Sequence, residues 1–482
     1  MCGIVGFCNE TKFVSKKIFK SLKILQHRGS DSCGISTFDN RFYIHKKSGK
    51  VRDVFNEQIL NKLKGKSGIG HVRYATQGEN NDEEAQPFFI SYPFGISMVH
   101  NGNITNRKEI QKKLENQFFS IKRTNDVELI LFTLANELKK INLSDINEND
   151  IFNALEVTQN TLKGAYSVIS LIGNKGMLAF KDEYGIRPLV FAKKVNENNN
   201  ISYGFASETI ALTRLGYEII KELKPSEAIF IDNHGNIHSK ILKKEKKEKI
   251  CIFEFIYFAK PESVINNLSI AKEREKYGEL IANSLKKYNI KADFITEIPE
   301  TAYFSAISLS KSLNIPYKKV IIKNNNIGRS FIQPNQKSRE SILQEKFTII
   351  EEFIKDKIIV VVDDSIVRGT TAKHIIKLMK IAKAKKIYMI SSSPMIKYPC
   401  VYGIDMSISS ELIANNRTKN EIKDILGVDE LFYLELSDLK EFYKEYNFCD
   451  ACFSGKYPTN ITIKEIKEIE RKRLINKNNK NL

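Results

Sequence analysis

The spacing of the hydrophobic positions changes character about halfway along the chain. Up to about residue 240, short apolar runs alternate with Gly, Asn and Asp, a pattern typical of strands separated by turns; examples are residues 69–74, 95–100 and 166–171. Between these runs, the segments 13–26 and 126–141 repeat apolar residues at helical spacing. The first half is therefore predicted to contain sheets with helices packed on them.

From about residue 250 the pattern is that of helices alternating with apolar strands. Residues 358–362 are apolar on both faces, which is typical of a strand buried in a parallel sheet. Strands are also expected at 294–298 and 386–390, and helices over 271–287 and 372–384. Because a parallel pair of strands needs a crossover connection, this order predicts an α/β unit.

The two patterns divide the 482 residues into two large domains. Every residue of 243–249 is charged, so this segment is the expected linker. We place the first domain at 2–240 and the second at 250–460. The helical spacing after Ile463 predicts a basic helical tail over 461–482.

Composition narrows the class of protein further. Apolar residues make up 42% of the chain and charged residues 28%, which excludes collagen-like, disordered and disulfide-scaffold proteins. The net charge of +19 would suit a nucleic-acid or anionic-membrane partner, but Lys and Asn are spread along the whole chain rather than gathered in one patch. We therefore expect neither a nucleic-acid partner nor a membrane partner.

The first residues and the absence of long apolar stretches predict a cytoplasmic protein. No stretch approaches the roughly 18 apolar residues of a membrane-spanning helix, and residues 1–7 lack the basic and long apolar segments of a secretory signal. In a reducing compartment, seven cysteines are better candidates for nucleophiles or metal ligands than for disulfides. Cys8 and Cys33 are expected to be core or bystander residues.

Cys2 is a candidate nucleophile because it directly follows the initiator methionine. A small second residue permits removal of Met1, which would place a free α-amine on the same residue as the thiol. An α-amine with a pKa of about 7.7–8.0 can accept the thiol proton at neutral pH. The alternative is that Cys2 is a small buried hydrophobic residue.

Polar and glycine-rich segments next to predicted strands could bind an amino-acid carboxamide. These segments are residues 27–32, 71–78 and 100–106. Arg73 can clamp an α-carboxylate and Asp126 can pair with an α-ammonium group. Asn101 and the backbone amide of Gly102 can stabilise a tetrahedral oxyanion. Taken singly, Asn101-Gly102 is more often a turn, and a lone Arg or Asp is more often a solvated charge.

Together these segments resemble the N-terminal-nucleophile glutamine amidotransferases, whose glutaminase domain begins Cys-Gly-Ile. The resemblance covers roughly residues 2–240 and implies an αββα fold. It implies catalysis by Cys2, Asn101 and Gly102, with glutamine bound by Arg73 and Asp126. Ser30 and Asn125 depart from the family pattern and leave its charged residues intact.

Residues 362–371 follow the predicted buried strand 358–362 and open a helix. A turn that feeds a helix N-terminus offers backbone amides and the helix dipole to a phosphate. Gly369 allows close approach of the backbone, and Thr370 and Thr371 add hydroxyl donors. Asp363 and Asp364 can hold ribose hydroxyls or a hydrated Mg²⁺. The alternative is a strand followed by a helix that an Asp caps.

This segment resembles the phosphoribosyl pyrophosphate motif of the type I phosphoribosyltransferases. The resemblance implies a parallel-sheet domain, with 297–302 as a pyrophosphate loop and 323–334 as a mobile loop over the substrate. It implies Mg²⁺ held by Thr301, Asp363 and Asp364, where Glu300 and Thr301 replace the Asp and Ser of many members. The implied phosphoribosyl pyrophosphate ligands are Asp363, Asp364, Ser365, Arg368, Gly369, Thr370, Thr371 and Arg329.

The order of the two domains resembles the amidophosphoribosyltransferase family. The resemblance implies glycosyltransferase and glutaminase activity, with ammonia transferred from glutamine to phosphoribosyl pyrophosphate. The products would be 5-phosphoribosylamine, glutamate and pyrophosphate, in the first step of purine synthesis. We expect closure of 323–334 to couple the two sites, and the resemblance implies a homotetramer inhibited by purine nucleotides.

Two other functions fit parts of the sequence. A phosphoribosyltransferase-like domain can serve as a ligand-sensing or nucleic-acid-binding regulator, but a regulator has no use for Cys2. Another glutamine amidotransferase, such as a sugar-isomerising or asparagine-forming one, does not need the Asp363-Asp364 cradle. Glutamate release measured with and without phosphoribosyl pyrophosphate separates the three.

Four further cysteines suit a metal centre. Cys449 and Cys452 form a C-x₂-C pair, and Cys251 and Cys400 are distant in the sequence. Four thiolates suit either Zn²⁺ or an iron-sulfur cluster, and a thioredoxin-like redox pair is the alternative for the C-x₂-C. The surrounding segments resemble the family branch that binds a 4Fe-4S cluster, which implies a structural or oxygen-sensing cluster.

Overall fold

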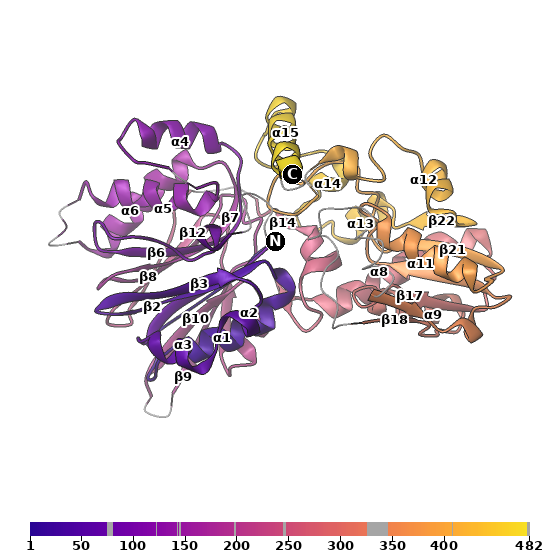
Figure 1. Cartoon of the computed structure of the whole chain (residues 1–482), viewed down its shortest axis with the longest axis horizontal. Helices are drawn as coiled ribbons and strands as arrows, with labels where there is room; N and C mark the ends of the chain where they lie inside the picture. The colour runs from indigo at the N-terminus through magenta and orange to yellow at the C-terminus, as the bar shows by residue number, and fades with distance from the viewer. Residues whose placement is uncertain are drawn as a thin grey trace.

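The computed structural model consists of two lobes side by side, with the N-terminus near their junction (Figure 1). It describes residues 1–74, 81–121, 123–141, 143, 146–196, 199–243, 247–324, 346–406 and 408–479, without the side chains of 476–479. We call residues 1–243 the N-terminal lobe and residues 247–479 the C-terminal lobe. Within the described residues, none of the helices is both long and apolar enough to cross a membrane.

Two antiparallel sheets form the centre of the N-terminal lobe. In spatial order the first contains β11 (Glu218–Glu222), β9 (Val190–Val195), β10 (Ile201–Ala206), β1 (Gly3–Cys8), β4 (Ser67–Arg73), β2 (Ser32–Asp39) and β3 (Arg41–Ser48). The second contains β13 (Ile237–Ile241), β12 (Glu227–Asp232), β8 (Gly176–Lys181), β7 (Gly164–Ile172), β6 (Ile96–Ile104) and β5 (Phe88–Ile90). Ile4, Ile69, Val99 and Ile169 belong to the apolar layer between the sheets.

Helices cover the outer face of each sheet. The first sheet carries α1 (Ser15–Ile24), α2 (Val51–Val54), α3 (Glu57–Lys62) and α7 (Ile210–Thr213). The second carries α4 (Arg107–Glu115), α5 (Asp126–Leu138) and α6 (Glu148–Thr161). The Asn125 side chain caps α5 by accepting a hydrogen bond from the Val127 amide, at 3.3 Å. These four layers confirm the predicted αββα fold.

The C-terminal lobe is built on a parallel sheet. Its order is β17 (Phe294–Glu297), β20 (Ile358–Asp363), β21 (Lys386–Ser391) and β22 (Glu430–Tyr433). Val360 and Val362 pack toward α8 (Ile270–Leu285) and α9 (Tyr303–Leu313), whereas Ile359 and Val361 pack toward α11 (Thr370–Ile381). Alternate residues of β20 therefore face opposite apolar layers, as expected from a run that is apolar on both faces.

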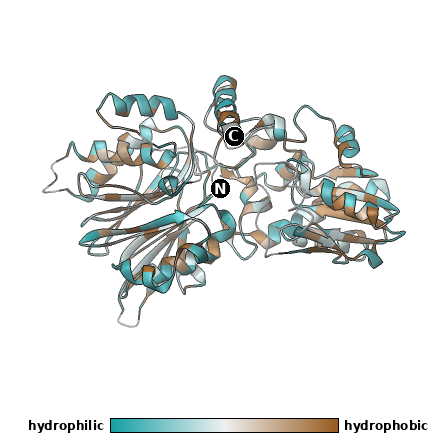
Figure 2. Cartoon of the chain, viewed as in Figure 1, coloured by the Kyte–Doolittle hydropathy of each residue, from teal (hydrophilic) through white to brown (hydrophobic). Residues whose placement is uncertain are grey.

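The remaining elements lie around this sheet. They are β14 (Ile250–Cys251), a π-helix η3 (Glu254–Phe258), β15 (Val264–Ile265), β16 (Leu268–Ser269), β18 (Ile321–Lys323), β19 (Phe347–Ile349), α12 (Lys419–Leu426), α13 (Leu436–Phe442), β23 (Phe448–Cys449), α14 (Ala451–Ser454) and α15 (Ile463–Asn479). The predicted tail helix is α15, which lies above the junction of the lobes (Figure 1). Figure 2 shows that α15, like α4, consists largely of hydrophilic residues. Ile466 and Ile469 nevertheless pack against the core.

Candidate active sites

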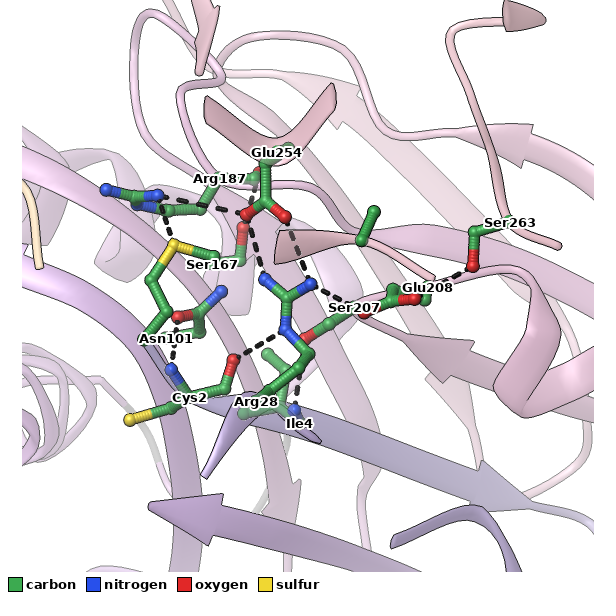
Figure 3. A network of polar contacts seen from close by, with 12 residues as sticks. Cys2, Ile4, Arg28, Asn101, Ser167, Arg187, Ser207, Glu208, Glu254 and Ser263 are labelled. Atoms are coloured by element: carbon green, nitrogen blue, oxygen red, sulfur yellow. Dashed lines mark hydrogen bonds and ion pairs between the residues drawn. The ribbon is translucent and has the colours of Figure 1, made fainter. Parts of the chain in front are cut away.

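Cys2 lies between Met1 and β1, at the junction of the two lobes (Figure 3). Its backbone nitrogen donates a hydrogen bond to Oδ1 of Asn101, at 3.1 Å, and its thiol lies 3.9 Å from the Tyr74 carbonyl oxygen. Met1 is buried, and its sulfur lies 2.6 Å from Nη1 of Arg187. The backbone of the predicted nucleophile is therefore hydrogen-bonded to Asn101, a residue of β6 in the second sheet.

Asn101 and Gly102 lie in β6 beside Cys2. Asn101 is fully buried, and within the described part of the chain its Nδ2 has no hydrogen-bond partner. Gly102 has φ +147°, and a Cβ built on it would lie 1.9 Å from the Ala165 carbonyl oxygen. Only glycine fits this position, since any side chain would displace β6 from β7.

The side chains of Arg73 and Asp126 are both buried. Asp126 begins α5 and accepts a hydrogen bond from the Ile104 amide, at 2.9 Å. Its other oxygen lies 3.7 Å from Arg107, and burial raises the pKa of its carboxyl. Arg73 ends β4, with its guanidinium 3.9 Å from the Glu84 carboxylate. The two predicted glutamine-binding residues thus lie on β4 and α5, and Ile104 joins Asp126 to the strand that carries Asn101.

The histidines of the segments 71–78 and 100–106 are core residues. His71 and His100 are buried, and Nε2 of His71 lies 3.2 Å from the His100 carbonyl oxygen. Burial lowers the pKa of His100 to about 3 and that of His71 well below its ordinary value. Both imidazoles are therefore neutral at physiological pH and poorly suited to general acid–base work.

The predicted phosphate cradle joins β20 to α11 in the C-terminal lobe. Asp363 ends β20 and Gly369, with φ +74°, is the residue before α11. Oδ1 of Asp363 accepts a hydrogen bond from the Asp364 amide, at 3.0 Å, and Oδ1 of Asp364 accepts one from the Ser365 hydroxyl, at 2.7 Å. The left-handed conformation of Gly369 turns the chain into the helix, as a phosphate-binding turn requires.

The two aspartates form an electrostatically strained pair. Burial and the neighbouring Asp364 raise the pKa of Asp363 well above its ordinary value. Burial also raises the pKa of Asp364 to about 6, although hydrogen bonds from Ser365 and Thr301 and the charge of Arg274 oppose this. Thr301 therefore lies where it was predicted, beside the acidic pair. A bound cation would relieve the repulsion.

Arg368 contacts acidic residues of the segment 405–411. Its Nε donates a hydrogen bond to Oε2 of Glu411, at 2.7 Å. Its Nη2 lies 3.5 Å from Oδ2 of Asp405. The predicted ligand Arg329 and most of the predicted loop 323–334 lie outside the described residues.

One cavity of about 730 Å³ extends along both sites. Its lining includes Met1 and Tyr74 from the N-terminal lobe and Thr301, Asp363, Asp364 and Thr371 from the C-terminal lobe. The Ile404–Met406 segment and Tyr257 also border it. The surroundings of the predicted nucleophile and of the predicted phosphate cradle thus border one cavity that is partly open to solvent.

The four predicted metal-binding cysteines converge in the core of the C-terminal lobe. Cys251 of β14 and Cys449 of β23 are paired across a parallel bridge, and all four cysteines belong to one apolar cluster. Burial, followed by the charges of neighbouring thiols, raises the pKa values of Cys449 and Cys452 well above the ordinary value. Among the described residues, no three His, Cys, Asp or Glu form a group that could hold a metal ion.

Comparisons with known proteins match both halves. A glutamine amidotransferase domain model matches residues 71–214, and a phosphoribosyl transferase domain model matches residues 267–392. The amidophosphoribosyltransferase of Haemophilus influenzae is 40% identical over 471 residues, which is 95% of this chain and 93% of that protein. The chain belongs to the amidophosphoribosyltransferase family. The Archaeoglobus fulgidus amidophosphoribosyltransferase is 36% identical and covers 96% of this chain and 98% of its own.

Solved structures support the same conclusion. Glutamine phosphoribosylpyrophosphate amidotransferase from B. subtilis, complexed with ADP and GMP, has a TM-score of 0.84 at 33% identity and covers 96% of this chain and 98% of its own. A structure described as the allosteric regulatory enzyme of purine biosynthesis has a TM-score of 0.86, also at 33% identity, and covers 98% and 99%. The predicted fold class and the predicted activity, glutamine-dependent amination of phosphoribosyl pyrophosphate in purine synthesis, are confirmed by this membership.

Sequence reasoning gave no role to a buried ionic network behind Cys2 (Figure 3). Arg28 donates to the Cys2 carbonyl oxygen, at 3.0 Å, and pairs with Glu208 and Glu254. Arg187 donates to the Tyr402 carbonyl oxygen and lies 3.8 Å from Glu254. Arg28 stands in the segment 27–32, but its partners Glu208 and Glu254 are far away in sequence.

A second connection between the lobes runs through residues 401–405 of this amidophosphoribosyltransferase-family chain. The Asn103 side chain donates to the Val401 carbonyl oxygen, at 2.7 Å, and Tyr74 donates to Asp405, at 3.2 Å. A Cβ on Gly403 would lie 2.8 Å from the Gly102 carbonyl oxygen. The strand that carries Asn101 and Gly102 is therefore in backbone contact with the C-terminal lobe.

The close approach at Gly102 generates a testable prediction. Gly102→Ala should lower glutamine-dependent activity by about 10²-fold or more, because the new Cβ displaces the strand that carries the predicted oxyanion donors. The control is Gly216→Ala, at another positive φ, where a Cβ would meet only the flexible end of Lys194. Steady-state glutamate release measures both, and a fully active Gly102→Ala variant contradicts the assignment.

Proposed function

We propose that Cys2 hydrolyses glutamine and that the released ammonia crosses the shared cavity to phosphoribosyl pyrophosphate bound at residues 363–371. The cavity is the observation that carries this proposal, since its lining joins Met1 and Tyr74 to Asp363 and Asp364. Enclosure favours transfer of ammonia because it separates the molecule from bulk water. The predicted closure of 323–334 would complete this enclosure.

Removal of Met1 would prepare the nucleophile. The freed α-amine, with an ordinary pKa of about 7.7–8.0, would accept the thiol proton. Oδ1 of Asn101 already accepts a hydrogen bond from this nitrogen, at 3.1 Å, so the amine has an orienting partner. Loss of Met1 would also vacate a buried position in the cavity wall.

The oxyanion of the tetrahedral intermediate would be stabilised by Asn101 and Gly102. Nδ2 of Asn101 is buried and has no hydrogen-bond partner within the described chain, so a developing negative charge would satisfy it. The Gly102 amide would be the second donor. Asp126 would pair with the α-ammonium group of glutamine and Arg73 with its α-carboxylate.

Ammonia would then attack C1 of the ribose as pyrophosphate leaves. Ser365, Arg368, Gly369, Thr370 and Thr371 would hold the phosphoribosyl group, with the N-terminus of α11 facing its 5′-phosphate. Two buried adjacent carboxylates and a threonine hydroxyl suit Mg²⁺, which keeps most of its water ligands. Bound at Thr301, Asp363 and Asp364, Mg²⁺ would offset the charge of the leaving pyrophosphate.

We further propose that Cys251, Cys400, Cys449 and Cys452 hold a 4Fe-4S cluster. Their burial in one core and their mutual electrostatic interaction support this proposal. Four thiolates could also hold Zn²⁺, and the resemblance of the surrounding segments to the cluster-binding branch of the family favours the iron-sulfur cluster. The cluster would be structural or oxygen-sensing, since neither half-reaction transfers an electron.

Our proposals on regulation and assembly rest on family membership. The B. subtilis relative is described as a complex with ADP and GMP, and we propose that purine nucleotides inhibit this chain too. It stays a prediction that the chain forms a homotetramer, that it is cytoplasmic and that it has no nucleic-acid partner. Family membership favours the enzyme over a ligand-sensing regulator.

Glutamate release with and without phosphoribosyl pyrophosphate tests the coupled reaction. We expect strong stimulation by phosphoribosyl pyrophosphate in the wild type. Cys2→Ala, which still permits removal of Met1, should lower glutamine-dependent product formation about 10³-fold or more and leave ammonium-chloride-dependent formation intact. Glutaminase activity in Cys2→Ala, or full activity in a chain that mass spectrometry shows to retain Met1, contradicts the role of Cys2.

Binding of Mg²⁺ should depend on pH. Because the pKa of Asp364 is about 6, its carboxyl is mostly protonated at pH 5.5 and ionised at pH 7.5. A ligand must lose its proton to bind, so the Mg²⁺ affinity measured by calorimetry should be at least about fourfold higher at pH 7.5. Asp364→Asn should weaken both Mg²⁺ binding and its pH dependence, leaving Asp363 as the carboxyl of the pair that still titrates, and the exposed Asp424→Asn should keep the full dependence. A wild-type affinity that does not change with pH overturns the assignment.

The cluster proposal predicts the colour and metal content of the purified protein. Protein prepared without oxygen should be brown, contain about four irons per chain and lose its visible absorbance in air. Cys452→Ser should contain less than half of this iron, whereas Cys33→Ala should keep all of it. Colourless protein with bound Zn²⁺ would exclude the cluster.

A further inference from the structure

Glu254 belongs to the C-terminal lobe but pairs with Arg28, the residue of the N-terminal lobe that binds the Cys2 carbonyl oxygen. It begins the π-helix η3, three residues after Cys251, and its side chain is fully buried. Figure 3 shows its carboxylate directed at the guanidinium of Arg28. Oε1 accepts from Nη2 at 2.8 Å and Oε2 accepts from Nη1 at 3.0 Å, so the pair is bidentate.

The orientation of Arg28 decides where Cys2 lies. The guanidinium is planar, and a bidentate carboxylate fixes that plane. With Nη1 and Nη2 held by Glu254, Nε points at the Cys2 carbonyl oxygen, at 3.0 Å. Cys2 is thereby held at two points, because its nitrogen is bound to Asn101 on the other side.

Glu208 cannot supply this constraint by itself. It contacts only Nη1 of Arg28, through Oε1 at 2.7 Å, and the same oxygen accepts from His27. Its Oε2 is bound to the Lys260 amide and the Ser263 hydroxyl. A single contact leaves the guanidinium free to rotate about that bond, whereas the two contacts of Glu254 do not.

Resting on the proposed role of Cys2, we propose that Glu254 is a positioning residue for glutamine hydrolysis. Through the Arg28 fork it fixes the carbonyl group of the nucleophilic residue, so the C-terminal lobe completes the active site of the N-terminal lobe. Glu254 touches neither glutamine nor the reacting atoms in this arrangement. Its segment continues into Tyr257 and Phe258, which line the shared cavity, so η3 borders both sites.

The test uses Glu254→Gln and Glu254→Asp in the full chain. Gln keeps the shape and one acceptor but removes the charge and the second acceptor, and Asp keeps the charge with a shorter reach. For Glu254→Gln we expect kcat for glutamine hydrolysis to fall at least tenfold and KM for glutamine to change less than threefold. The ammonium-chloride-dependent rate, which does not use Cys2, should stay within twofold. Glu254→Asp should recover part of the lost kcat.

A matched control and a second measurement keep the test decisive. Glu279→Gln removes an exposed carboxylate paired with Lys276 in the same lobe and should match the wild type. Alkylation of the Cys2 thiol by iodoacetamide, followed by mass spectrometry, should be at least fivefold slower in both Glu254 variants. If Glu254→Gln fails to fold, Glu254→Asp is tested alone by the same measurements, which are kcat and KM for glutamine hydrolysis, the ammonium-chloride-dependent rate and the alkylation rate of Cys2.

Three results would overturn the proposal. These are an unchanged kcat, a rise in KM with kcat kept, and a parallel loss of the glutamine-dependent and ammonia-dependent rates, which indicates a merely structural role. Failure of the underlying function is distinguishable, since it would appear as a wild-type chain without glutaminase activity. If the wild type hydrolyses glutamine and Glu254→Gln hydrolyses it at the same rate, only the assignment of Glu254 is contradicted.

Discussion

The burial of two guanidinium groups at the junction of the lobes constrains everything around them. Arg28 and Arg187 are fully buried, and Glu208 and Glu254 bring two carboxylates to the same place. Leaving one such charge unpaired costs about 3–5 kcal/mol, so the pairs form together or not at all. Because Arg28 belongs to one lobe and Glu254 to the other, this requirement also fixes how the lobes meet.

The position of the lobes in turn creates the cavity. Met1 and Tyr74 share a cavity wall with residues 363–371, and the lobes are joined there by the contacts of Tyr74 with Asp405 and of Asn103 with Val401. Each half-reaction needs a different chemistry: a thiol beside an amine for hydrolysis, and a phosphate cradle with an acidic pair for transfer. Under the proposed function, the shared cavity would let the small neutral product of one half-reaction reach the site of the other.

Much of the fold was predictable because it depends on short-range patterns. The continuous apolar run 358–362 indicated a strand buried on both faces. In the structure, β20 packs its alternate residues into two apolar layers. Helical spacing located α5, α8 and α11 to within a few residues of their ends. The buried pairing of Arg28 with Glu254 was not predictable, because 226 positions separate the two residues and no local pattern links one to the other.

By itself the sequence determined the types of element, the chemistry that each segment could carry and the close backbone approach that Gly369 permits. These are properties of neighbouring residues, governed by periodicity, side-chain chemistry and allowed backbone angles. Only the tertiary structure decided that Asn101 holds the nitrogen of Cys2, that His71 and His100 are neutral core residues, and that a carboxylate of the second lobe orients Arg28. Such contacts depend on the path of the whole chain, since burial and pairing arise between residues that the sequence keeps far apart.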